Sequence, residues 1–170
     1  SDIDLLFLLP YFGSANLADD ANAYHATAES LRPGDILIKR WQRRGIGHVM
    51  LVKDVHERPE GKMAAELASG SMPRRQAVWE SQAASKMLFT NERTGGPGTN
   101  RNGRDYVDLG GGLKRFLAAE MHSGRWRNRV MAEDLGNYLR WSDKTSRAAR
   151  PARFEDLLVT VSPEELREEL

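Results

Sequence analysis

The segment 32–52 constrains the fold of this chain more than any other stretch. It opens on a Pro-Gly-Asp turn that leads into a short apolar run, 35–40, and a basic loop follows. Gly-Ile-Gly then places His48 at the start of a second run, 48–55, which is rich in Val and Leu. Two apolar runs joined by a glycine-containing loop are typical of a β-hairpin. The segment therefore predicts a hairpin whose second strand begins with a histidine.

The rest of the first half adds further strands. Residues 63–68 predict a third strand, although their alanines also suit a helix, and residues 76–81 predict a short fourth one. A Gly-rich stretch at 94–103 predicts a long flexible loop, because glycine and proline interrupt regular structure. This loop lacks the Gly-Lys-Ser/Thr ending of a phosphate loop.

The second half favours helices. The spacing of Leu113, Phe116, Leu117 and Met121 predicts a helix over 113–122, and residues 130–141 show a broadly helical pattern. Strands followed by helices indicate the α+β class. We therefore expect one domain over residues 1–170, with a small antiparallel sheet packed against helices and a long C-terminal helical extension from about residue 95.

Composition excludes several classes of function. A net charge of +1 over 170 residues makes no general case for nucleic acid or an anionic membrane as a partner. The absence of cysteine excludes disulfides, cysteine-ligated metal sites and thiol catalysis by this chain. Its four histidines lack metal-ligand spacing, so we expect neither a metal nor a cofactor. No apolar run is long enough to predict a membrane span.

Two short stretches are locally basic and contain tryptophan: 39–44 (Lys-Arg-Trp-Gln-Arg-Arg) and 125–129 (Arg-Trp-Arg-Asn-Arg). One interpretation is that they are solvated loops and surface positions. The other is that they form a basic, aromatic rim that binds an anionic or sugar-bearing ligand. The sequence leaves both open.

His48 and Glu66 are the candidate catalytic pair. If the second and third strands are adjacent and antiparallel, the two side chains could share one face of the sheet. A carboxylate that accepts a hydrogen bond from an imidazole fixes its tautomer and stabilises the imidazolium. Such a pair suits nucleophilic hydrolysis. The alternative is that His48 is a structural strand residue and Glu66 a surface residue.

Three motifs together resemble the NlpC/P60 family of papain-like cell-wall peptidases: Arg32-Pro-Gly-Asp-Ile-Leu-Ile, Gly47-His48-Val-Met-Leu-Val and Ala65-Glu66-Leu-Ala-Ser-Gly70. The resemblance covers roughly residues 31–70. It implies a papain-like fold and hydrolysis of amide bonds in peptidoglycan stem peptides, with peptidoglycan or peptide as substrate. It also implies that His48 acts as general base with Glu66 as its orienting residue, and an extracytoplasmic location, periplasmic or secreted.

The family nucleophile, a cysteine upstream of the Pro-Gly-Asp turn, is absent, and Ile3 occupies the nearest-looking place. Three explanations remain open: the nucleophile lies on a segment before Ser1, it has been replaced by mutation, or the protein is a pseudoenzyme that keeps the groove. The competing hypothesis is therefore a catalytically inactive binding or interaction module on the same scaffold. A third is an unrelated soluble domain in which the Pro-Gly-Asp and Gly-His matches are accidental, and a sheet with His48 and Glu66 on opposite faces would support it.

Arg74, Arg75 and Trp79 are the candidate substrate-binding residues. Two guanidinium groups near a turn suit a carboxylate such as the end of a stem peptide, and Trp79 follows the third predicted strand. The alternative is that the arginines are ordinary surface residues. The sequence does not indicate an oligomeric state.

Overall fold

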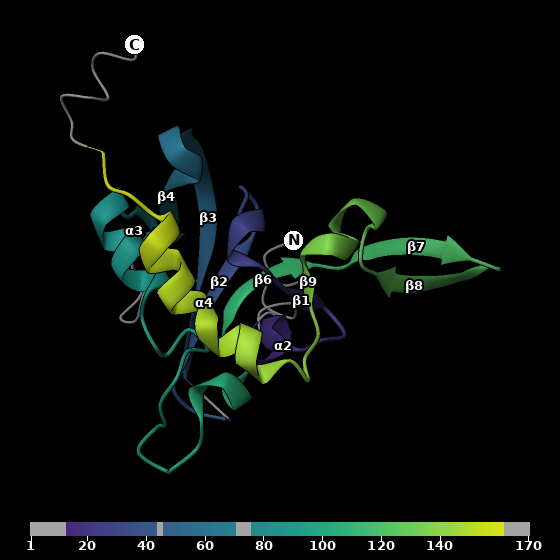
Figure 1. Cartoon of the computed structure of the whole chain (residues 1–170). Helices are drawn as coiled ribbons and strands as arrows, with labels where there is room; N and C mark the ends of the chain where they lie inside the picture. The colour runs from purple at the N-terminus through teal and green to yellow at the C-terminus, as the bar shows by residue number, and fades with distance from the viewer. Residues whose placement is uncertain (1–12, 44–45, 71–75, 162–170) are drawn as a thin grey trace.

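The computed structural model of the chain describes residues 13–43, 46–70 and 76–161. These residues form helices and an antiparallel sheet, which confirms the α+β class (Figure 1). The predicted segment 2–12 and the predicted terminal helix after Ser162 lie outside the described residues. The strands of the main sheet are β1 (Ala23–Ala26), β2 (Ile36–Arg40), β3 (Gly47–Arg58), β4 (Lys62–Ser69), β5 (Val78–Trp79), β6 (Gly112–Phe116) and β9 (Tyr138–Leu139).

The main sheet has seven strands in the order β5-β4-β3-β2-β6-β1-β9, and every neighbouring pair is antiparallel. The predicted hairpin is confirmed: β2 pairs with β3, with Leu37 opposite Met50 and Lys39 opposite His48. The predicted strands at 63–68 and 76–81 are also confirmed as β4 and β5.

The predicted helix over 113–122 is wrong. These residues form β6 and then β7 (Ala118–His122), and β6 lies inside the sheet between β2 and β1. Residues 130–141 hold the 3-10 helix η5 (Ala132–Asn137) and β9 rather than an α-helix. The prediction of a helical extension from about residue 95 is therefore wrong. Much of this part of the chain forms strands, and two of them, β6 and β9, complete the main sheet. Four of the five residues of β6 are buried, so the alternation that identifies a half-exposed strand is missing.

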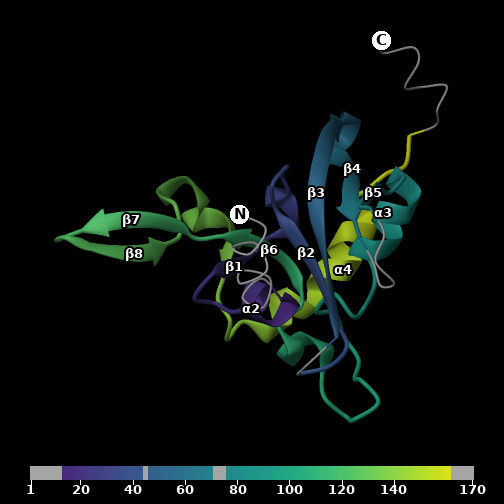
Figure 2. The ribbon, with the colours of Figure 1, turned by 180° about the vertical axis from the view of Figure 1, so that it is seen from behind.

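Two helices cover one face of the sheet. These are α3 (Gln82–Phe89) and α4 (Lys144–Leu157), which lie side by side in both ribbon views (Figures 1 and 2). The rings of Phe89 on α3 and Phe154 on α4 meet with their centroids 4.7 Å apart. Burial of each ring contributes about 1.5–3 kcal/mol relative to an exposed ring. Both belong to the main core, which also contains Leu37, Met50, Val52, Leu67 and Leu113.

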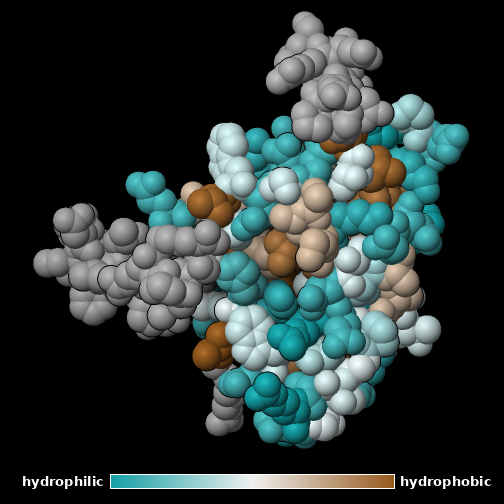
Figure 3. Space-filling model, turned by 90° about the vertical axis from the view of Figure 1, so that its left-hand side faces the viewer, coloured by the Kyte–Doolittle hydropathy of each residue, from teal (hydrophilic) through white to brown (hydrophobic). Residues whose placement is uncertain are grey.

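The opposite face carries a smaller core beneath the short helix α2 (Ser14–Ala18). Ile36 and Ile38 of β2 pack there with Ala18, and Leu17 and Val49 lie against them. Because successive residues of a strand point to opposite faces, β2 supplies both cores. Seen from the side on which α3 lies in Figure 1, the surface is mainly hydrophilic with separate hydrophobic patches (Figure 3).

A two-stranded hairpin projects from the body, formed by β7 and β8 (Arg125–Arg129) (Figures 1 and 2). Ser123 and Gly124 at its tip both have positive φ, which is the geometry of a tight hairpin turn. All of β8 is exposed, including Trp126 at 69%. None of the described helices is long and apolar enough to cross a bilayer.

Candidate functional site

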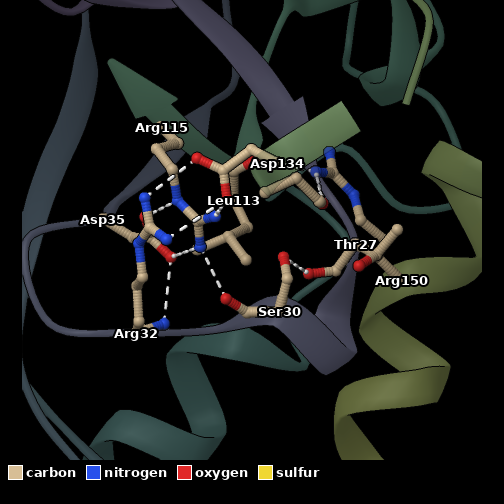
Figure 4. A network of polar contacts seen from close by, with 9 residues as sticks. Thr27, Ser30, Arg32, Asp35, Leu113, Arg115, Asp134 and Arg150 are labelled. Atoms are coloured by element: carbon tan, nitrogen blue, oxygen red, sulfur yellow. Dashed lines mark hydrogen bonds and ion pairs between the residues drawn. The ribbon is translucent and has the colours of Figure 1, made fainter. Parts of the chain in front are cut away.

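The aspartate of the Pro-Gly-Asp turn has a structural role. Asp35 is 1% exposed and accepts a hydrogen bond from the backbone N–H of Arg32 at 3.0 Å, which closes the turn. Its carboxylate also bonds Arg115 of β6, with 2.6 Å between Nε and Oδ1 (Figure 4). Asp35, the last residue of the Pro-Gly-Asp turn, therefore links this turn to the central strand β6.

Arg115 is the centre of a buried network, which we call the Arg115 network. Its Nη1 lies 2.6 Å from Asp134 Oδ1, and Arg32 approaches the same carboxylate with Nη2 2.9 Å from Oδ2 (Figure 4). Burial lowers the pKa of Arg115, but the hydrogen bond and the charge of Asp35 outweigh it and leave that pKa raised. Every member is paired with another member of the network, and of its charged side chains only Arg32 is partly exposed, which indicates a structural role for the buried members.

The structure does not bring the predicted catalytic residues together. β3 and β4 are adjacent and antiparallel as expected, but His48 shares a face with Met50, which lies opposite Ser69. Glu66 lies opposite Asp54 and shares the other face with Ala68. His48 and Glu66 therefore point to opposite faces of the sheet. Strand register decides the face, and register is not readable from the spacing of two residues.

Glu66 joins a small surface group instead. Its Oε2 lies 3.0 Å from Nζ of Lys53, and the same ammonium sits 3.8 Å above the ring of Trp79. Trp79 of β5 is 70% exposed. Arg74 and Arg75 lie outside the described residues.

On the face of His48, a hydroxyl and a carboxylate lie close together. Ser69 donates its hydroxyl proton to Glu80 and is almost fully buried. The register makes His48 a diagonal neighbour of Ser69, at a typical distance of about 7–8 Å between strand positions.

A polar cleft of about 390 Å³ lies elsewhere, between the β2–β3 connection and the loop 96–106. Of the described residues that line the cleft, none carries a carboxylate. They supply two guanidinium groups, three carboxamides, an indole and a phenol: Arg93, Arg101, Gln42, Asn100, Asn102, Trp41 and Tyr106.

A buried arginine shapes the first wall of the cleft. Arg40, 2% exposed at the end of β2, donates from Nη2 to the carbonyl oxygens of Gln42 at 3.0 Å and Arg43 at 2.7 Å. Its own N–H bonds the carbonyl of Arg93 at 3.0 Å, which brings the segment after α3 against β2. Burial, and then the charge of Arg93, lower the pKa of nearby Lys39.

Asn100 holds the second wall. Its carboxamide oxygen accepts hydrogen bonds from the N–H groups of Asn102 at 2.9 Å and Arg104 at 3.0 Å. Its Nδ2 donates to the carbonyl of Trp41 at 3.1 Å, so one side chain joins both walls. The Gly-rich stretch 94–103 is a loop, as predicted, and Asn100 holds its second half in a hydrogen-bonded turn.

The sequence pointed to part of this cleft. Trp41 and Gln42 belong to the basic, aromatic stretch 39–44 for which a ligand-binding rim was one interpretation. Arg93 and Tyr106 carried no local signal, because they reach the cleft only through contacts between segments some fifty residues apart. Among the described residues, no group of His, Asp or Glu could hold a metal ion.

No protein-family model matches the chain, and no curated protein or solved structure is significantly similar to it. The resemblance to the NlpC/P60 family, the hydrolase activity and the extracytoplasmic location therefore stay predictions.

Proposed function

We propose that this protein is a binding module for an anionic glycan-peptide ligand, of the kind that peptidoglycan stem peptides represent. The observation that carries the proposal is the cleft, which combines Arg93 and Arg101 with three carboxamides and two aromatic rings. The choice of cell-wall material rests on the NlpC/P60 resemblance of residues 31–70, whereas the opposite faces of His48 and Glu66 favour the alternative of an unrelated domain.

Each type of side chain in the cleft has a partner group in such a ligand. Guanidinium groups bind carboxylates in a two-pronged geometry, as at the end of a stem peptide. Carboxamides both donate to and accept from amides and hydroxyls. The indole of Trp41, which is partly exposed, provides an apolar surface with a polar edge, suited to a sugar ring, while the phenol of Tyr106 is almost fully buried in the wall of the cleft.

Binding is favoured over hydrolysis because His48 and Glu66 lie on opposite faces of the sheet. In the predicted pair the carboxylate would orient the imidazole through a hydrogen bond, and side chains on opposite faces cannot form it. The chain also contains no cysteine to act as nucleophile.

The test is titration of purified soluble disaccharide-peptides, with the stem carboxylates free, into the whole chain by calorimetry. We expect saturable binding that Arg101→Ala weakens at least about tenfold, the loss typical of a charge-assisted pair. Matched controls are Arg127→Ala and Trp126→Ala on the projecting hairpin, which leave the affinity unchanged. Absence of binding, or equal losses in the hairpin variants, would overturn the proposal.

Hydrolysis through a hydroxyl is a second candidate, favoured by one observation: Ser69 bonds Glu80 on the face that carries His48. In this reaction the Ser69 hydroxyl attacks an amide carbonyl, Glu80, which already accepts its hydrogen bond, takes the proton and returns it to the leaving amine, and water then releases the acyl group. Mass spectrometry of the same mixtures tests it. Released peptide that disappears in Ser69→Ala and in Glu80→Gln supports hydrolysis, and intact ligand excludes it.

A further inference from the structure

A second polar region lies around His25, in the middle of β1 on the face of α2. His25 is 1% exposed and its ring lies 5.5 Å from that of Trp141. Its Nδ1 lies 3.1 Å from Nη2 of Arg150. A guanidinium group only donates hydrogen bonds, so Nδ1 is the acceptor and the proton of the neutral ring sits on Nε2.

The protonated nitrogen of His25 has no hydrogen-bond partner in the part of the chain that the structure describes. His25 lines a cavity of about 70 Å³, together with Asp20, Leu139 and Trp141. A cavity needs about 10–15 Å³ for one water molecule, so this one has room for a small polyatomic ligand. The buried N–H is a donor that such a ligand would satisfy.

The surroundings of His25 are strongly positive. Lys114 of β6 lies opposite His25 of β1. Lys114 and Arg147 of α4 both lie near the ring of Trp141. We call the group of His25, Lys114, Trp141, Arg147 and Arg150 the Lys114 cluster. Lys114, Arg147 and Arg150 are each no more than 3% exposed. Burial is the main cause that lowers the pKa of Lys114 to about 8 and that lowers the pKa of His25.

The cluster is short of negative charge. Arg150 donates to the carbonyl oxygens of Leu113 at 2.6 Å and Ala26 at 3.0 Å, and Arg147 donates to those of Trp141 and Val107. The nearest carboxylate with a bond to the cluster is Asp20, whose Oδ1 lies 3.2 Å from Nζ of Lys114. Its side chain is 49% exposed, so much of its charge is directed to water.

The chain is built to accommodate this charge. Gly112 has φ +112°, and a Cβ at that position would lie 2.1 Å from Nη2 of Arg150. Only glycine leaves room for the guanidinium group here. Buried cations without matched carboxylates are costly to the fold, and an anion would reduce that cost.

We propose that the cavity beside His25 binds a small oxyanion, a carboxylate or a phosphate, with one oxygen accepting from His25 Nε2–H in the positive field of the Lys114 cluster. Asp20 lines the same cavity, and its carboxylate, which pairs with Lys114, opposes an anion there. This site shares no residue with the cleft and does not depend on the proposed function.

The test is calorimetric titration and thermal unfolding of the whole chain in sodium phosphate, sodium acetate and sodium chloride at equal ionic strength. We expect phosphate or acetate to raise Tm above the value in chloride, and the anion that does so identifies the ligand class. Asp20→Asn removes the competing charge on the partly exposed side and should tighten binding about tenfold or more. Asp54→Asn, a carboxylate of similar exposure elsewhere, is the matched control and should change nothing.

If a folded His25→Phe variant binds the anion with the wild-type affinity, the anion binds elsewhere and the proposal is overturned. Equal Tm in all three salts, for both the wild type and Asp20→Asn, would also overturn it. Arg101→Ala should retain the anion response, which separates this site from the cleft.

Discussion

Lys114 and Arg115 are consecutive residues of β6, so their positive charges lie on opposite faces of the sheet. The two charges differ in the counter-charge that each one meets. Arg115 meets the buried carboxylates of Asp35 and Asp134, each 2.6 Å away. Lys114 meets a backbone carbonyl and the partly exposed Asp20. The Arg115 network is matched in charge, while the Lys114 cluster lacks a buried counter-charge and leaves Nε2 of His25 without a hydrogen-bond partner among the described residues.

This difference separates a structural network from a candidate ligand site. A buried ion pair whose geometry is complete has no further partner to recruit, and removal of one member leaves the other charge uncompensated. A group of cations held by carbonyl oxygens still gains from an anion. Burial of charge alone therefore does not mark a functional site, whereas burial without a counter-charge points to one.

The largest expected effect is that of Arg115→Met. The variant leaves Asp35 buried without a cation and leaves Asp134 with the partly exposed Arg32 alone, which costs about 3–5 kcal/mol of unfolding free energy. Denaturant unfolding with linear extrapolation measures this loss. A loss below about 1 kcal/mol would mean that water or rearrangement compensates Asp35 and Asp134, and the contrast between the two faces would be lost.

The pH dependence of stability should separate the two faces. The pKa of His25 is lowered in the folded state, so below about pH 6.5 the unfolded chain binds a proton that the folded chain does not. Stability then falls as the pH decreases, with a slope of up to about 1.4 kcal/mol per pH unit. Burial raises the pKa of Asp134, but bonds and charges from Tyr24 and Arg115 leave it lowered, so its contribution is lost only below about pH 4.

Denaturant unfolding at pH 7, 6 and 5 checks this, with His25→Asn as the comparison. We expect a smaller decrease for the variant over this range. Parallel curves for the two proteins would show that His25 is not held neutral by its surroundings.

Lys114→Met should have a small effect on stability, about 1 kcal/mol or less. The variant loses the contact with Asp20 but removes a buried charge, and replacement of a buried charge by an apolar side chain of similar length is often near neutral. It is the matched partner of Arg115→Met, with the same new residue one position away. Similar losses of unfolding free energy in Lys114→Met and Arg115→Met would refute the difference between the two faces of the sheet.

The smallest effect is expected for Glu66→Gln. Its ion pair with Lys53 is partly exposed on the surface of the sheet, and such pairs contribute about 0–1 kcal/mol. Thermal unfolding at low and high salt measures it, and we expect no difference larger than that range. A larger loss would give Glu66 a role that its contacts do not indicate.

The half of the sheet with a readable pattern was predictable from the sequence. β2, β3, β4 and β5 combine apolar runs with turn residues at their ends. β1 and β6 were missed because their residues are nearly all buried, and because His25, Lys114 and Arg115 are polar residues that a pattern analysis assigns to the surface. Their burial follows from contacts with α4 and with the Pro-Gly-Asp turn, far away in the chain.

The candidate sites were predictable only in part. The basic stretch around Trp41 suggested a rim for a ligand, and the structure places it on a cleft. The pairing of His48 with Glu66 failed because one step of register exchanges the faces of a strand. The positive cluster around His25 had no sequence signal, since its members come from β1, β6 and α4.

Ligand binding in the cleft can be located by an NMR titration of the isotope-labelled chain with a soluble disaccharide-peptide. We expect saturable shifts of the Trp41 indole, the Asn100 and Asn102 carboxamides and the Arg101 guanidinium, while the Trp126 indole stays unchanged. Shifts confined to the projecting hairpin, or no shifts in the cleft at saturating ligand, would contradict it.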